Sequence, residues 1–376
     1  MSFSDNPLFP GASAQEDCAK TKQGQGDQAQ EEAPFKTDVP RITRRRALTI
    51  SGAIAGAQLM PWPANSFSRP TERAQTYIHR WRGRAFGTQA SFLLHGVTKA
   101  DAGRLFQRCR KEISRLEQVF SLHDPGSAVS RLNHDSRLDS PPIELVNLLE
   151  KCNRISEASK GAFDITVQPL WNLYKRHFTD QSNALVGPGI SDRELALRKV
   201  DYTSIDITPE KIAFTQPDMM ITLNGIAQGY ITDRIVEIMR EHGIQNVLVD
   251  LGETRSLGEH TDRRPWNIGI IDPRKPEIIG GQIALRNEAV ASSGGYGTIF
   301  EPTGRNHHLF DPLSGKSAQY NLGVTVIAQN ATTADALSTA ISVMPLDQAV
   351  SFIKFSKTAR ALVTTLDGAL VNLKSS

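Results

Sequence analysis

A carboxylate and two hydroxyls recur at helical spacing near the C-terminal end of the sequence. Asp335, Ser338 and Thr339 lie at positions i, i+3 and i+4 of a helix predicted over residues 333–343, so their side chains share one face. This oxygen ligand set suits Mg²⁺ rather than zinc. The alternative is an ordinary helix start, with a threonine as N-cap and the aspartate in the first turn. Capping alone does not account for the two hydroxyls that follow.

A second segment, residues 222–230, leads from a predicted strand into a predicted helix through two glycines and reads TLNGIAQGY. Small residues at such a turn let the backbone approach a phosphate at a helix N-terminus, where free N–H groups point outward. The spacing matches neither a P-loop nor a dinucleotide fingerprint. An ordinary glycine turn is an equally good interpretation of this segment.

The third segment joins a Ser-Gly-rich strand end, residues 292–296, to the sequence HHLFDPLSG at residues 307–315. Serine and glycine at a strand end suit backbone contacts to an anion or a ring. His308, beside an Asp-Pro turn, is a candidate general base or pyrophosphate donor. The alternative is a pair of solvated loop histidines.

Composition excludes several classes of function. The 376 residues carry a formal net charge of only +3, which gives no support for nucleic-acid binding. No apolar stretch is long enough to span a membrane. Cys18, Cys109 and Cys152 show no zinc or thiol-chemistry spacing, and a disulfide between Cys109 and Cys152 stays open.

The pattern of elements favours an α+β fold, because strands and helices are grouped more than strictly alternated. A strand hairpin over residues 77–94 turns at Phe86-Gly87-Thr88, and residues 178–194 read as a loop. Helices are predicted over residues 99–120, 143–159, 229–242, 333–343 and 346–355, with a short helical turn at 128–133. Strands are predicted over residues 204–207, 211–214, 220–223, 246–251, 266–271, 281–285, 289–292, 324–328 and 360–365.

The N-terminal residues are predicted to form a leader and a targeting signal rather than part of the folded domain. Residues 1–40 are polar and lack apolar periodicity, which indicates a disordered leader. Residues 41–68 combine the pattern Thr-Arg-Arg-x-x-Leu with a short apolar run, as in a twin-arginine signal peptide, and predict export to the periplasm. The alternative is a chance basic patch before an amphipathic helix. The remaining residues, 69–376, form the predicted catalytic domain.

Together and in this order, seven segments resemble the ApbE family, the FAD:protein FMN transferases. The likeness runs from about Phe86 to Thr365. Its segments are FGT (86–88), SAVSRLN (127–133), GAFDIT (161–166), NGIAQGY (224–230), LGE (251–253), HHLFDP (307–312) and TADALST (333–339). The resemblance implies an ApbE-type, T-fold-like architecture of largely antiparallel sheets flanked by helices.

The resemblance also implies the reaction, a Mg²⁺-dependent transfer of FMN from FAD to a Thr or Ser hydroxyl of an acceptor protein, with release of AMP. The acceptor class would include membrane-bound electron-transfer subunits. The catalytic base would be His308. The oxygens around Mg²⁺ would come from the Gly225 carbonyl and from the side chains of Asp335, Ser338 and Thr339. The residues lining the FAD site would be Phe86, His123, Ala162, Phe163, Asp164, Thr222, Gln228 and Phe310.

Three residues in the glycine turn depart from the family pattern. The family usually has Asp where Thr222 stands, a charged residue where Gln228 stands, and Gly or Ser where Asn224 stands. Ser338 is one of several residues that the family allows at its position. The TLNGIAQGY variant resembles a NosX-like branch, whose members are thought to flavinylate a membrane protein of nitrous oxide reduction.

Two other functions fit the same residues. An FAD pyrophosphatase would use the same metal site with water in place of the protein hydroxyl. A periplasmic FAD-binding or delivery protein would bind the dinucleotide without cleaving it.

Overall fold

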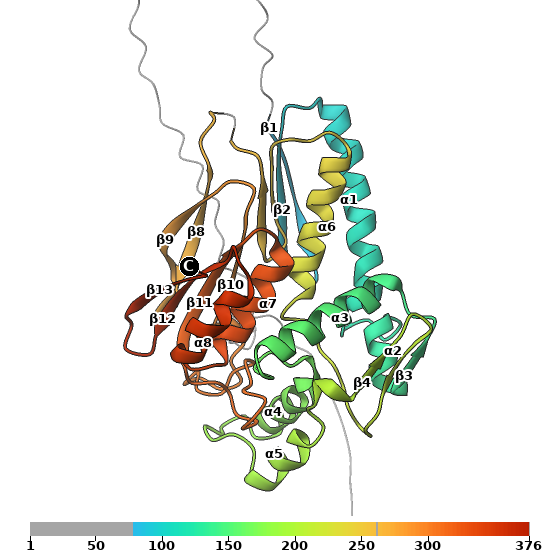
Figure 1. The fold of residues 1–376 in the computed structure, drawn as a ribbon, viewed down its shortest axis with the longest axis vertical. Helices are drawn as coiled ribbons and strands as arrows, with labels where there is room; N and C mark the ends of the chain where they lie inside the picture. Colours follow the sequence, from blue (N-terminus) through green and yellow to red (C-terminus); the bar gives the residue numbers. More distant parts are fainter. Residues whose placement is uncertain (1–77, 261, 376) are drawn as a thin grey trace, which may run out of the picture. The chain divides into compact units, whose positions relative to one another are not determined.

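An eight-stranded antiparallel sheet organises the part of the chain that the computed structural model describes, residues 78–260 and 262–375 (Figure 1). Its strands, in spatial order, are β1 (Ile78–Ala85), β2 (Thr88–His95), β6 (Val247–Asp250), β7 (Thr254–Leu257), β10 (Ala289–Ser293), β11 (Asn321–Ala328), β12 (Arg360–Thr365) and β13 (Leu370–Lys374). Every neighbouring pair runs antiparallel. The predicted α+β class is therefore confirmed.

Both faces of this sheet are covered. The helices α1 (Lys99–Phe120), α6 (Ala227–Glu241) and α7 (Ala331–Ser342) lie over one face, and a ribbon of β8 (Trp266–Asp272) and β9 (Lys275–Leu285) packs against the other. Successive residues of β2 show the two-fold alternation of a strand, because Phe92 and Leu94 join the helical core while Leu93 packs towards β8.

A second group of elements extends from the helical side and lies in the lower part of Figure 1. It consists of α2 (Ala128–Asp135), α3 (Ile143–Ala158), α4 (Gln168–Asp180), α5 (Ile190–Leu197) and a three-stranded sheet of β3 (Arg137–Asp139), β5 (Lys211–Phe214) and β4 (Ile205–Ile207). Short 3-10 turns lie at Ile165–Val167, Tyr202–Ser204, Gly295–Gly297 and Ile353–Phe355, the last one following α8 (Leu346–Phe352).

Helices α6 and α7 cross at close range because one helix has a glycine at the contact. A Cβ atom on Gly229 would lie 2.3 Å from the carbonyl oxygen of Ala331, so no side chain fits there. Asp233 of α6 then accepts hydrogen bonds from the first N–H groups of α7, at Ala331 (2.7 Å) and Thr332 (2.8 Å). The side chain of Asn330 caps the same helix end by accepting from Thr333 N–H.

The structure corrects several sequence predictions. Residues 220–223 form no strand with any other described residues, because the Asn133 side chain accepts from Ile221 N–H (2.7 Å) and donates to its carbonyl (2.9 Å). Part of the predicted loop 178–194 is helical, since α4 continues to Asp180 and α5 begins at Ile190. Strands β3, β7 and β13 were not predicted, and they are short or lie at a sheet edge.

The structure also bears on the cysteines and on membrane-spanning helices, but not on the N-terminal segments. Cys109 and Cys152 are buried free thiols, so the two do not pair in this structure. Among the described residues, no helix is long and apolar enough to cross a membrane. The leader (residues 1–40) and the signal peptide (41–68) lie outside the described residues, and so does the start of the domain predicted over 69–376.

Candidate functional site

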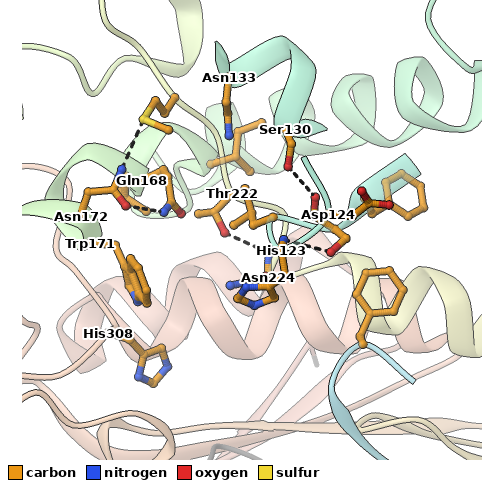
Figure 2. Close-up of a pocket in the computed structure, with 18 of the residues that line it drawn as sticks. His123, Asp124, Ser130, Asn133, Gln168, Trp171, Asn172, Thr222, Asn224 and His308 are labelled. Carbon is orange, nitrogen blue, oxygen red and sulfur yellow. Dashed lines mark hydrogen bonds between the residues drawn. The ribbon is translucent and has the colours of Figure 1, made fainter. Parts of the chain in front are cut away.

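A cavity of about 1670 Å³ opens where the α1–α2 loop, α4 and the α6–α7 pair meet (Figure 2). Sites for drug-sized ligands usually enclose about 300–1,000 Å³, so this cavity has room for a dinucleotide. Ten of the predicted site residues line it: Phe86, His123, Ala162, Phe163, Asp164, Thr222, Gly225, His308, Phe310 and Thr339. Gln228, Asp335 and Ser338 are not part of the lining.

A group of oxygen atoms lies where the start of α6 meets α7, and we call Gly225, Asp335, Ser338 and Thr339 the oxygen cluster. The Thr339 hydroxyl is 3.5 Å from the Gly225 carbonyl oxygen. One carboxylate oxygen of Asp335 accepts from Gly229 N–H at 3.0 Å, so the aspartate caps the neighbouring helix rather than its own. The helix-start alternative for Asp335 is thereby excluded, because Asn330 and Asp233 occupy that role.

Ser338 is fully buried and faces the sheet rather than the cavity. Its hydroxyl donates to the Asp335 carbonyl at 2.9 Å and lies 2.8 Å from the Ser293 hydroxyl. Ser293 also lies 3.5 Å from the Thr339 hydroxyl. The position of Ser338 therefore fits a supporting role behind Thr339 better than the predicted role of a metal ligand.

The remaining oxygens of the cluster fit a hard cation. Mg²⁺ takes oxygen ligands, keeps several waters, and is held by one or two carboxylates together with substrate phosphates. Asp335, Thr339 and the Gly225 carbonyl supply such a partial set. Within residues 78–260 and 262–375, no three His, Cys, Asp or Glu side chains converge to hold a metal.

His308 presents an imidazole to the cavity from the loop after β10. Its Nδ1 lies 3.1 Å from the Thr298 carbonyl oxygen. A carbonyl only accepts, so Nδ1 carries the proton, and in the neutral ring the lone pair is on Nε2. His307, by contrast, has its ring between the Ala318 carbonyl (3.0 Å) and Leu309 N–H (3.3 Å) and does not line the cavity. The two neighbouring histidines thus have different roles.

Aromatic side chains form much of the remaining lining, and we call Phe86, His123 and Trp171 the aromatic lining. Phe86 has a φ of +49° at the turn between β1 and β2, a conformation that is rare for a bulky residue. Its N–H donates to the Glu117 carboxylate at 2.7 Å, which holds the turn against α1. Strain of this kind is often found where a side chain must face a ligand.

Asp164 lines the cavity, yet its carboxylate is used to hold the backbone. It accepts from Thr166 N–H (2.7 Å) and from Tyr202 N–H (3.2 Å). Burial raises the pKa of Asp164 above its ordinary value, against the lowering effect of these hydrogen bonds. Ala162 and Phe163 precede it on the same tight segment, so Asp164 positions that part of the lining.

The three departures in the glycine turn have different surroundings. Thr222 lines the cavity, with its N–H donating to the Ile165 carbonyl (2.7 Å), and the exposed Asn224 follows it. The Gln228 side chain is buried and donates to the Leu251 carbonyl at 3.3 Å, close to the positive-φ residue Gly252. Gln228 was predicted to line the FAD site, and instead it supports the turn after β6.

The chain is similar in sequence and fold to proteins of one known family. The model of the ApbE family matches residues 86–363 of the 376. The chain belongs to the ApbE family. A structure of an ApbE protein from Thermotoga maritima is 30% identical, with a TM-score of 0.71 over 80% of this chain and 98% of that one. The flavin transferase ApbE of Vibrio cholerae has a TM-score of 0.69 at 22% identity, again over 80% and 98%.

Curated relatives carry a functional name. The FAD:protein FMN transferase of Haemophilus influenzae is 27% identical over 87% of this chain and 96% of its own length. The protein of the same name from Escherichia coli K12 is 24% identical over 86% of this chain and 92% of its own length.

This ApbE-family cavity also contains residues that the sequence analysis missed. Gln168, Trp171, Asn172 and Lys175 line it from one face of α4. Gln168 donates to the Asn172 side chain at 2.9 Å, and the Lys175 ammonium lies 4.9 Å from the Trp171 ring centroid. Their spacing of three to four residues is a helical signal that could have grouped them, had the helix been recognised.

Proposed function

We propose that this chain is an FAD:protein FMN transferase that joins FMN to a Thr or Ser hydroxyl of an acceptor protein and releases AMP. One observation carries the proposal. A cavity of dinucleotide size brings Gly225 and Thr339 of the oxygen cluster and the oriented imidazole of His308 to the same space, with the Asp335 carboxylate beside it at the start of α6. The names of the curated relatives support the same activity.

The transfer is a phosphoryl-type displacement. The acceptor hydroxyl oxygen attacks the phosphorus on the FMN side of the pyrophosphate and forms a new P–O bond. The P–O bond to the bridging oxygen breaks, and AMP departs with that oxygen. The hydroxyl proton passes to Nε2 of His308, whose Nδ1–H is held by the Thr298 carbonyl.

The oxygen cluster supplies the electrostatic part of the reaction. Asp335, Thr339 and the Gly225 carbonyl would hold Mg²⁺, which neutralises charge on the pyrophosphate when it is bound. The carboxylate of Asp335 is kept in place by Gly229 N–H, so the close crossing of α6 and α7 orients it. Asp335 is buried and Gly225 and Thr339 are half-buried, so the surrounding protein would shield one side of the reacting phosphates from bulk water.

The proposal is tested by following the fate of FAD. The purified chain is incubated with FAD, Mg²⁺ and an acceptor domain of a relative's target protein, and the acceptor is examined by in-gel flavin fluorescence. A fluorescent acceptor supports transfer. Free FMN and AMP without labelled acceptor would show a pyrophosphatase, and intact FAD bound to the chain would show a binding or delivery protein. Either of these results contradicts the proposal.

We also propose export to the periplasm by the twin-arginine route, on the basis of the sequence of residues 41–68. Residues 1–68 fused to a reporter that is active only after export should give periplasmic activity. Replacing both Arg44 and Arg45 by Lys should abolish that activity, and unchanged export would contradict the route.

A further inference from the structure

Two histidines and a tryptophan form a cluster outside the cavity. His95 is the last residue of β2, His260 lies in the loop between β7 and β8, and Trp266 begins β8. The two imidazole centroids are 5.1 Å apart with their planes at 70°. The Trp266 ring lies 5.1 Å from His95 and 5.3 Å from His260. None of the three lines the cavity, so the cluster is separate from the proposed active site.

His95 is buried without the hydrogen bonds that such a residue needs. It is 5% exposed, and among the described residues neither of its ring nitrogens has a hydrogen-bond partner. Leaving a buried polar group unsatisfied costs about 1–3 kcal/mol, and native proteins satisfy such groups with protein, water or an ion.

His260 has the carboxylate partner that is typical of a metal-binding histidine. Its Nδ1 lies 2.9 Å from the Asp262 carboxylate, the kind of contact that usually orients a metal-binding imidazole. The loop is anchored by backbone bonds, because Glu259 N–H donates to the Asn246 side chain at 2.9 Å and His260 N–H to the Arg264 carbonyl at 3.0 Å.

We propose that His95 and His260 together bind one divalent transition-metal ion of the class that prefers imidazole nitrogen, with Cu²⁺ bound most tightly. Two imidazoles bound at 2.0–2.1 Å to adjacent positions of one ion have ring centroids roughly 4.5–5 Å apart, whether the ion is tetragonal or tetrahedral, and the observed separation is 5.1 Å. Because no third His, Cys, Asp or Glu side chain converges with them in the described part of the chain, water completes the coordination. The ion would tie the end of β2 to the loop before β8.

The test is a titration of the full chain, made without a histidine tag, with Cu²⁺ in the presence of excess Mg²⁺. We expect one tight equivalent by calorimetry, nitrogen couplings from two imidazoles in the EPR spectrum, and quenching of Trp266 fluorescence. His95→Gln should abolish the tight equivalent, and Asp262→Asn should weaken it about 10–100-fold.

A matched control comes from a second His–Asp pair. His134 lies 2.7 Å from Asp135 but is solvent-exposed, so His134→Gln should leave the tight equivalent unchanged. If His95→Gln does not fold, His260→Gln tests the same site from the loop. Asp335→Ala should retain Cu²⁺ binding, which separates this site from the proposed Mg²⁺ site. Three results would overturn the proposal. They are equal Cu²⁺ affinity of the wild type and both histidine variants, EPR coupling to a single imidazole, and the absence of tight Cu²⁺ binding.

Discussion

The oxygen cluster, through Gly225 and Thr339, and the aromatic lining face the same cavity, but the two are built in opposite ways. The oxygen cluster lies between two helices that have no spare space, since a Cβ on Gly225 would come within 2.9 Å of the Thr339 side chain. The aromatic lining comes from a strained turn at Phe86, an exposed loop at His123 and one face of α4 at Trp171. In the proposed reaction, the catalytic groups would therefore be held rigidly, whereas the side chains that contact the ligand would come from more accessible segments.

The largest effect is expected for the carboxylate of the oxygen cluster. Asp335→Asn keeps the shape but removes the charge, so Mg²⁺ affinity should fall by more than about 100-fold and transfer at ordinary Mg²⁺ should be lost. Partial recovery at high Mg²⁺ is the expected signature, measured as initial rate against Mg²⁺ concentration. Full activity at low Mg²⁺ would show that the oxygen cluster does not hold the metal.

His308→Gln should lower the transfer rate at saturating FAD by about 100-fold or more, because the acceptor hydroxyl loses its proton acceptor. FAD binding, followed by flavin fluorescence, should change far less, since the residue acts on the acceptor. A large loss of FAD affinity with an unchanged rate would show that His308 binds FAD and does not act as the catalytic base. It would also contradict the assignment of FAD binding to the aromatic lining.

Rigidity of the helix crossing can be tested with two glycines. Gly229→Ala places a methyl group 2.3 Å from the Ala331 carbonyl, and overpacking of this kind costs about 1–3 kcal/mol of folding free energy. Gly103→Ala is the matched control, because α1 offers open space there and the change should stabilise the helix by about 0.5–1 kcal/mol. Denaturant unfolding of both variants measures the contrast, and equal effects would contradict the close crossing.

A smaller effect is expected in the aromatic lining. Trp171→Ala should weaken FAD binding by about 3–10-fold, the value of an aromatic contact, while the rate at saturating FAD is retained. Trp171→Phe should restore most of the affinity, and Lys175→Met should change it less than Trp171→Ala does. A fall in the saturated rate as large as that of His308→Gln would mean that the lining takes part in the chemistry.

The smallest effect is expected for Asp250, which lies at the turn that Gln228 supports. Burial raises the pKa of Asp250 to about 7, so between about pH 4 and pH 7 the folded chain binds a proton that the unfolded chain releases. This group therefore makes stability decline as pH rises through that window. Asp250→Asn should reduce the drop in Tm between pH 5 and pH 8. An unchanged drop in Tm would show that the Asp250 carboxyl is solvated and that its pKa is not raised.

The sequence predicted what depends on periodicity and local chemistry. Apolar spacing located α1 and α6, and the spacing of Asp335 and Thr339 identified the helix that contributes to the cavity. Spacing at i, i+3 and i+4 did not show that Ser338 faces the sheet, because one helical face can contact both a cavity and a packing partner. That distinction depends on Ser293, which lies far away in the sequence.

What the sequence could not predict depends on long-range contacts. Asn133 occupies the place of a strand partner for Ile221, so an apolar, strand-like segment pairs with a side chain instead. Gln228 turns away from the cavity because the Leu251 carbonyl accepts its amide. The N–H of Gly229 reaches Asp335 across more than a hundred residues. None of these hydrogen bonds can be predicted from the local sequence around either partner.

The most direct test of the central claim is the mass of the acceptor and the amount of AMP, measured in one reaction with FAD, with Mg²⁺ or with a chelator. We predict that the acceptor gains one FMN with loss of water, that AMP appears in equal amount, and that both depend on the metal. An acceptor of unchanged mass, whether FAD is intact or split into free FMN and AMP, would contradict the account.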